Sequence, residues 1–175
     1  AVDRAVVSTD DDEIASVAES AGLAAPFRRP EALSGDRISD IEVLEHAIEE
    51  CERLDDHLYD IVVMLQPTSP LRRVQHVEAC LAKLCSERLD SVWTVSPTDS
   101  KAHPLKQLVV GEGGALGYYD ERGASIIARQ QLTPVFHRNG LCYALTRQCV
   151  LEQRSILGQR AGAVVTDGHA VSIDT

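Results

Sequence analysis

Long apolar runs are absent from this sequence of 175 residues. No stretch approaches the roughly 18 consecutive apolar residues that a membrane-spanning helix needs, so we expect no membrane partner. Asp3 and Arg4 interrupt the start of the chain, so we expect no signal peptide and a cytoplasmic location. An excess of positive charge is also lacking, since the formal net charge is -10. Proteins that bind a nucleic-acid backbone usually carry a basic face, so we expect no nucleic-acid partner.

Cysteine and histidine show no spacing typical of a metal site. The cysteines are odd in number and form no CxxC pair: Cys51, Cys80, Cys85, Cys142 and Cys149. We expect them to be buried, reduced thiols, as in a cytosolic protein. The six histidines likewise lack the regular spacing of zinc ligands. A chain of this length can bury a core without a disulfide or a structural metal.

Apolar runs alternate with amphipathic helical patterns along the chain. We predict strands near residues 5–8, 61–65, 91–95 and 141–145, with a weaker one at 163–165. The run from Ile61 to Leu65 is apolar throughout, which suits a strand covered on both faces. This alternation predicts an α/β fold, a three-layer sandwich in which a mostly parallel sheet lies between helices.

The alternation breaks after Ser96. Residues 97–140 hold more than half of the chain's 11 glycines, and Val109-Val110 and Tyr118-Tyr119 flank a glycine-rich turn. This arrangement favours a β-hairpin. We therefore predict that residues 99–142 leave the sheet as a small separate segment, while residues 1–98 and 143–175 form the α/β core.

Polar side chains follow the most apolar strand. In open α/β sheets ligands bind beyond the carboxyl ends of the strands, and Gln66, Thr68 and Ser69 lie there beside Pro67 and Pro70. The prolines fix φ and stiffen the loop. The alternative is a purely structural loop whose Thr68 or Ser69 caps the next helix, and spacing alone leaves both possibilities open.

Charged residues mark further candidates. Arginine presents a rigid fork that matches carboxylate or phosphate, and it occurs in Arg129-Gln130-Gln131-Leu132, His137-Arg138-Asn139-Gly140 and Arg28-Arg29-Pro30. Taken singly, each is more simply a solvated surface arginine. Asp10-Asp11-Asp12 is best interpreted as a helix cap, because acidic residues stabilise a helix start. Ser172-Ile173-Asp174-Thr175 places a carboxylate where it could hold Mg²⁺.

Taken together, these segments resemble the acylneuraminate cytidylyltransferase family, the CMP-sialic acid synthetases. The matching runs are VVSTDDDEIA at 6–15, RPEALSGDRIS at 29–39, LQPTSPLR at 65–72, HPLK at 103–106, RQQL at 129–132, NGLCYAL at 139–145 and SIDT at 172–175. Their order and spacing resemble those of the family across essentially the whole chain.

The resemblance implies a nucleotide-diphospho-sugar transferase fold and a homodimer in which residues 99–142 reach the partner. It implies that CTP activates an acidic nine-carbon sugar of the sialic-acid type, giving a CMP-sugar and pyrophosphate. Mg²⁺ would be the cofactor, and the site would join two protomers. Legionaminic or pseudaminic acid is an alternative substrate.

The resemblance also assigns roles to individual residues. Arg29 matches a contact to cytidine, and Ser39 and Asp40 stand where the family has a serine of the nucleotide site. The residues that match the sugar-acid side are Gln66, Lys106, Arg129, Asn139 and Tyr143, with Arg129 positioned to hold a carboxylate. Asp174 matches one of two catalytic, metal-binding aspartates.

Three departures from the family bear on activity. Its opening strand and glycine-rich phosphate loop have no counterpart in these 175 residues, Ser172 replaces one metal-binding aspartate, and Asp40 replaces a serine. We therefore expect little turnover from this chain as it stands. The alternative function is a catalytically incomplete paralogue or fragment that serves as a sugar-acid-binding or dimer module.

Overall fold

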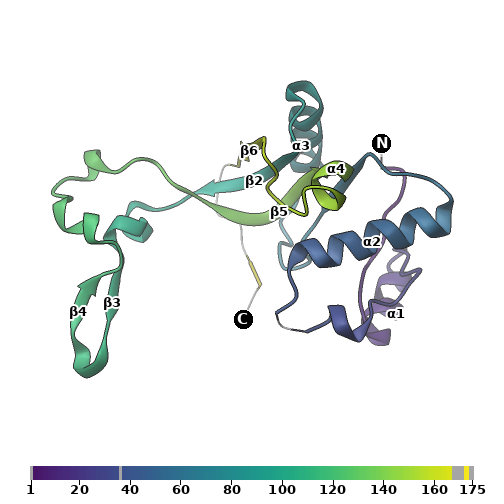
Figure 1. The fold of residues 1–175 in the computed structure, drawn as a ribbon, viewed down its shortest axis with the longest axis horizontal. Coiled ribbons are helices and arrows are strands. Elements are labelled where there is room, and N and C mark those ends of the chain that lie inside the picture. The colour runs from purple at the N-terminus through teal and green to yellow at the C-terminus, as the bar shows by residue number, and fades with distance from the viewer. Residues whose placement is uncertain (1, 36, 167–171, 174–175) are drawn as a thin grey trace. The chain divides into compact units, whose positions relative to one another are not determined.

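The chain folds into helices and two β-sheets (Figure 1). The computed structural model describes residues 2–35, 37–166 and 172–173. The α-helices are α1 (Asp12–Ser20), α2 (Asp40–Asp55), α3 (Val74–Glu87) and α4 (Arg147–Leu151). The strands are β1 (Ile61–Met64), β2 (Ser91–Pro97), β3 (Leu108–Val110), β4 (Leu116–Tyr118), β5 (Phe136–Thr146) and β6 (Ala161–Val165).

The chain divides into two compact units. The first consists of Ala1–Met64, Leu81–Val92 and Ala144–Gly162. The second consists of Leu65–Cys80, Trp93–Tyr143 and Ala163–Thr175. The segment 99–142 lies wholly inside the second unit, and its boundaries as a separate domain stay a prediction.

The larger sheet has four strands in the order β1-β5-β2-β6. Thr146 N donates to Asp90 O near one end of the β2–β5 pair, and Thr98 N donates to Val135 O near the other. These partners run in opposite directions along the chain, so β5 is antiparallel to β2. Backbone bonds at both ends of the other pairs make β5 antiparallel to β1 and β6 parallel to β2. The sheet is therefore mixed, with β1, β2 and β6 in one direction and β5 reversed.

Helix α2 shows how local sequence builds the first unit. Ser39 is its N-cap, and the carboxylate of Glu42 accepts from both the backbone N and the hydroxyl of Ser39. Leu44, Ile48 and Cys51 recur at helical spacing and are buried, and α2 contacts β1 and α4. Helix α2 therefore begins at its capping box and buries one apolar face.

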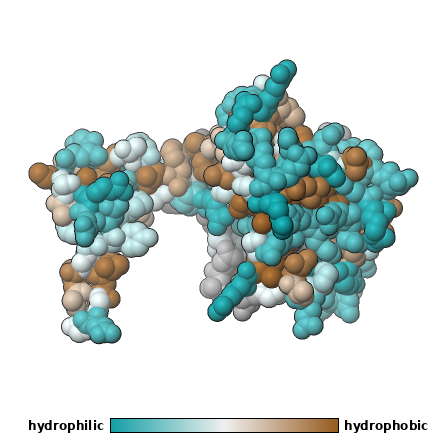
Figure 2. Space-filling view, in the orientation of Figure 1, coloured by the Kyte–Doolittle hydropathy of each residue, from teal (hydrophilic) through white to brown (hydrophobic). Residues whose placement is uncertain are grey.

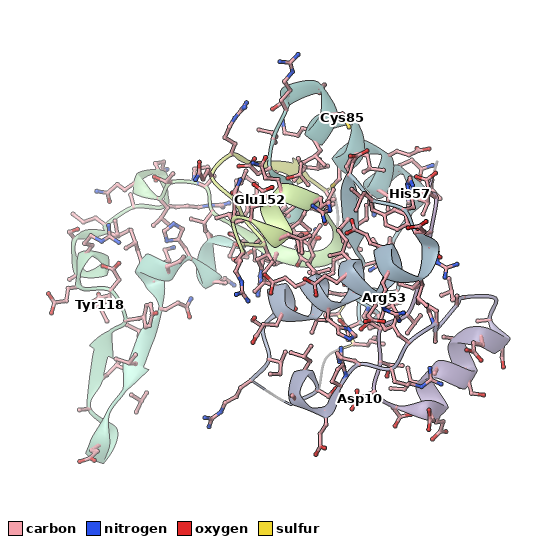
Figure 3. The ribbon with its side chains drawn as sticks, turned by 45° about the vertical axis from the view of Figure 1, so that its right-hand side comes forward. Asp10, Arg53, His57, Cys85, Tyr118 and Glu152 are labelled. Carbon is pink, nitrogen blue, oxygen red and sulfur yellow. The ribbon has the colours of Figure 1, made fainter. Side chains whose placement is uncertain are left out.

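Two local predictions need correction. Residues 5–8 do not form a strand: Val6 makes only an isolated parallel bridge with Ala24. All five cysteines are free, but Cys85, labelled on α3 in Figure 3, is exposed rather than buried. Its position in a helical pattern did not show which way the side chain faces. By contrast, Asp11 caps α1 as expected, since its carboxylate accepts from Ile14 N at 2.9 Å.

The predicted hairpin is present in the second unit. Strands β3 and β4 pair antiparallel, with Leu108 opposite Tyr118 and Val110 opposite Leu116. These apolar side chains are exposed, and Figure 2 shows apolar surface on the hairpin. Among the described residues, none of the helices has the length and apolar content needed to cross a membrane.

Candidate active site

A polar pocket lies in the second unit, between the loop that follows β1 and the first half of β5. Its volume is about 390 Å³, within the roughly 300–1,000 Å³ that small-molecule sites occupy. The described residues that line it are Gln66, Ser69, His137, Arg138, Asn139, Gly140, Tyr143 and Ser172. The structure therefore brings together Gln66, Asn139 and Tyr143, three residues for which the sequence predicts ligand contact.

Hydrogen bonds fix the loop of residues 65–70 to β5. Ser69 is buried, and its hydroxyl donates to Asn139 O at 3.0 Å. Ser69 N donates to Gln66 O and closes a turn, while Gln66 N donates to Gly140 O. Ser69 thus has a structural role, but it ties the loop to β5 instead of capping a helix. Gln66 lines the pocket.

Arg72 reinforces the same connection from the far end of the loop. Its guanidinium donates to three backbone carbonyl oxygens, those of Gln66, Gly140 and Leu141. Burial lowers the pKa of Arg72, since desolvation disfavours its charge. A partly buried arginine that binds only carbonyls in this way orders both walls of the pocket.

Gly140 permits the close approach of these two walls. Its φ is +69°, a conformation that side-chain-bearing residues rarely adopt. A Cβ atom there would lie 2.4 Å from Ser69 Oγ and 2.5 Å from Gln66 Oε1. Both the backbone conformation and the available space therefore require glycine at the pocket wall.

The side chain of Asn139 is engaged in a buried network. Its amide nitrogen donates to Ser96 Oγ at 3.0 Å and to Thr166 Oγ1 at 2.8 Å. Its amide oxygen accepts from Thr94 Oγ1 at 2.7 Å and from Leu141 N at 3.3 Å. Buried polar groups are stable only when satisfied in this way. The network holds the start of β5 against β2 within the second unit.

An aromatic pair stands beside the pocket. The rings of Trp93 and Tyr143 meet edge to face with centroids 5.1 Å apart, and the Tyr143 hydroxyl accepts from Gly140 N at 3.2 Å. The guanidinium carbon of Arg138 lies 5.7 Å from the Trp93 ring centroid, within range of a cation–π interaction. Tyr143 is buried, so this group is anchored in the core of the unit.

Two other predicted sugar-side residues lie outside this pocket lining. Lys106 ends the 3-10 helix Pro104–Lys106, and Arg129 begins the 3-10 helix Arg129–Gln131. Both side chains are exposed. Within one chain, the structure therefore does not bring them to the pocket with Gln66.

The predicted nucleotide-side residues lie in the first unit. Arg29 binds Asp10, labelled in Figure 3 before α1, at 3.2 Å, and its Nε donates to Ser34 Oγ at 3.3 Å. Ser39 and Asp40 form the N-terminal end of α2. Hydrogen bonds from Ser39 lower the pKa of Glu42, the partner in its capping box.

A magnesium site does not emerge from the described residues alone. Asp174 lies outside them, and among those described no cluster of three or more His, Cys, Asp or Glu side chains could hold a metal ion. The described pocket lining offers neutral oxygens but no carboxylate, whereas Mg²⁺ favours sites with one or two carboxylates. The lining residues therefore do not by themselves fit the ion.

Several residues of the site carry no strong sequence signal. Trp93 and Thr94 sit inside an apolar run and look like ordinary strand residues. Arg72 is one of two consecutive arginines in a polar stretch. His137 and Arg138 do have a signal, since they directly precede the Asn139-Gly140 pair at the start of β5.

Comparison with known proteins adds an independent line of information. The family model described as "Cytidylyltransferase" matches residues 1–169. Pseudaminic acid cytidylyltransferase of Campylobacter jejuni is 29% identical over 174 residues, covering 99% of this chain and 73% of that protein. N-acylneuraminate cytidylyltransferase of Streptococcus agalactiae is 30% identical over 172 residues, covering 97% of this chain and 39% of that protein.

A solved structure supports the fold. The CMP:2-keto-3-deoxy-manno-octonic acid synthetase complexed with CTP superposes with a TM-score of 0.61 and 19% sequence identity. The match covers 98% of this chain and 76% of that one. The predicted nucleotide-sugar transferase-like α/β fold is therefore confirmed.

Proposed function

Because the chain belongs to the cytidylyltransferase family, we propose that it transfers the cytidylyl group of CTP to an acidic nine-carbon sugar of the sialic-acid type. The sugar hydroxyl attacks the α-phosphorus of CTP, the bond between the α- and β-phosphates breaks, and pyrophosphate leaves. The observation that carries this proposal is the polar pocket of the second unit, which combines an arginine with amides and hydroxyls in about 390 Å³.

On the sugar side, the pocket residues divide into ligands and supports. The amide of Gln66 offers one donor group and one acceptor to sugar hydroxyls. The Tyr143 ring supplies a rigid wall. Asn139 already makes four hydrogen bonds, so its contribution is to hold β5 in place. Holding the acceptor in a fixed orientation is how such residues accelerate a transfer reaction.

On the nucleotide side, Arg29 is the proposed contact to cytidine. Its ion pair with Asp10 and its bond to Ser34 limit its motion, so less rotamer freedom is lost on binding. Ser39 and Asp40 complete the proposed nucleotide contacts. Asp40 sits in the first turn of α2, where the helix dipole favours negative charge.

The proposed active molecule is a homodimer, in which Lys106 and Arg129 of each protomer serve the site of its partner. Their exposure in the isolated chain supports this arrangement. So do the apolar side chains that β3 and β4 leave uncovered, because exposed apolar patches mark association surfaces. Five free cysteines support a reducing, cytoplasmic location.

Mg²⁺ is the proposed metal, with Asp174 as its candidate ligand. A divalent ion bound with CTP would offset phosphate charge and favour departure of pyrophosphate. We assign no catalytic step to it, because the described lining supplies no carboxylate.

Pyrophosphate release tests the proposal directly. The purified protein is assayed with CTP and Mg²⁺ against N-acetylneuraminate, pseudaminate and legionaminate. We expect slow pyrophosphate release with one of the three acids, well below the roughly one per second that is ordinary for an enzyme, because Ser172 and Asp40 stand where the family has a metal ligand and a serine. This activity should be lost with EDTA and recover on adding Mg²⁺. Neutral N-acetylmannosamine is the control acceptor.

The same assay separates the alternatives. The relatives named above act on different sugars at nearly equal identity, so the preferred acceptor identifies the substrate. If no pyrophosphate is released with any of the three acids but a sugar binds measurably, the result would instead support a non-catalytic binding module. If the protein neither turns over nor binds any of the three acids, that result contradicts the proposed function.

A further inference from the structure

The described pocket lining holds one strong cation and no anion. Of its residues only Arg138 is an arginine or lysine, and none is an aspartate or glutamate. Arg138 also forms no ion pair with any carboxylate among the described residues. A guanidinium stays charged at any physiological pH. The pocket therefore presents a positive charge that the surrounding described side chains leave uncompensated.

Arg138 is itself exposed, and an aromatic ring lies close enough to restrain its guanidinium. The guanidinium carbon of Arg138 lies 5.7 Å from the Trp93 ring centroid, and Trp93 in turn packs on the buried Tyr143. A cation–π contact of this kind restrains the guanidinium without using its N–H donors. An arginine restrained in this way loses less conformational entropy when it binds an anion.

The other pocket groups complement an anion on a hydroxylated ligand. Ser69 and Asn139 are committed to structural hydrogen bonds. Gln66 is then the lining amide that remains available to a ligand. A ligand that fits both the Arg138 guanidinium and the Gln66 amide would carry a planar anionic group next to hydroxyls. A sugar with a carboxylate meets this description.

We infer that Arg138 is the residue by which each chain's own pocket binds the carboxylate of the acidic sugar. The inference rests on the proposed function and deepens it, since it assigns to Arg138 a specificity role that the family resemblance gives to Arg129. Trp93 acts through Arg138 as a positioning residue. Arg129 and Lys106, being exposed outside this pocket lining, contribute from the partner protomer.

Calorimetric titration and kinetics together test the assignment. The probes are N-acetylneuraminate and its uncharged C1 amide, titrated into the parent protein and into Arg138→Gln. We expect the Kd of the acid to rise about tenfold or more in Arg138→Gln, as loss of a charge-assisted fork implies. The Kd of the amide and the KM for CTP should stay within about twofold, since neither uses this charge.

Three further variants sharpen the result. Arg138→Lys keeps the charge but loses the fork, so it should recover only part of the affinity for the acid. In the presence of Arg138, Trp93→Leu should weaken binding of the acid more than binding of the amide. Added to Arg138→Gln, it should change the affinity for the acid little further. Arg73→Gln removes an exposed arginine of the same unit outside the pocket lining and should bind the acid like the parent.

The outcomes distinguish this inference from the proposed function. The role of Arg138 is overturned if Arg138→Gln binds the acid as tightly as the parent does, or if it loses affinity for the acid and for the amide equally. Turnover by the parent would in that case still support the proposed function. If the parent neither binds the acid nor turns over any acidic sugar, both fail.

Discussion

At the residue scale, Gly140 shows how one position controls the pocket. Its positive φ and the contacts at 2.4 and 2.5 Å that a Cβ would make are separate costs. The first is a backbone strain of about 1 kcal/mol or more. The second forces Ser69 or Gln66 to move, and these side chains form the opposite wall.

We predict that Gly140→Ala destabilises the protein by about 2 kcal/mol or more and raises the KM for the sugar. Gly113→Ala is the matched control, because Gly113 has φ +70° but a Cβ added there would meet no atom within 4 Å. It should show the backbone cost without the change in KM. Urea unfolding and steady-state kinetics measure the two effects, and equal behaviour of both variants would contradict the steric argument.

At the element scale, the loop of residues 65–70 depends on Arg72. This one side chain donates to three carbonyls on the loop and on β5. Lysine would keep the charge, but an ammonium on a flexible stem cannot reproduce the planar fork. Some carbonyls would then be left without a donor in a partly buried setting.

We predict that Arg72→Lys lowers the free energy of unfolding by about 1–3 kcal/mol. The loop carries Gln66, so the KM for the sugar should rise while the KM for CTP stays unchanged. Arg73→Lys changes the exposed neighbouring arginine and should leave both quantities near the parent values. A parent-like melting curve for Arg72→Lys would show that the loop is held by other contacts.

At the scale of the whole molecule, the exposed apolar surface of the β3–β4 hairpin indicates an association surface. Val110 is 72% exposed and Leu116 is 69% exposed, and the two face each other across the strand pair. Figure 3 labels Tyr118 on the same hairpin. A two-stranded hairpin by itself is marginally stable in water, so burial between two copies would stabilise it.

We predict that the protein sediments as a dimer at micromolar concentration and that the double variant Val110→Lys, Leu116→Lys sediments as a monomer. Charges placed in an apolar interface are costly to bury. Leu58→Lys, an equally exposed apolar position of the first unit at 64%, should remain dimeric. A monomeric parent would remove the basis for a shared site.

Mixing two inactive variants provides a second test of the shared site. If Arg129 serves the partner's pocket, a heterodimer of Arg129→Ala with Gln66→Leu contains one intact site. Activity should therefore reappear when the two inactive proteins are mixed and allowed to exchange subunits. No recovery after proven exchange would place Arg129 and Gln66 in the same chain's site.

By itself, the sequence determined the α/β class, the places of β1, β2 and β5 and more weakly that of β6, and the hairpin, because helical and strand periodicity are local properties of the chain. It also singled out Gln66, Asn139 and Tyr143 through motif resemblance. It did not reveal that residues 5–8 lack a strand partner beyond the Val6–Ala24 bridge, since pairing depends on a distant segment.

Only the tertiary structure decided which side chains converge on the pocket. The bond from Ser69 to Asn139 joins positions 70 residues apart, and that from Arg72 to Leu141 spans 69. The packing of Trp93 beside Arg138 and Tyr143 likewise joins β2 to β5 within the second unit. Such contacts arise because β5 pairs antiparallel with both β1 and β2, and no local pattern records them. The family resemblance points to Arg129 as the carboxylate ligand, which stays a prediction, and the structure adds that the arginine among the described pocket-lining residues is Arg138.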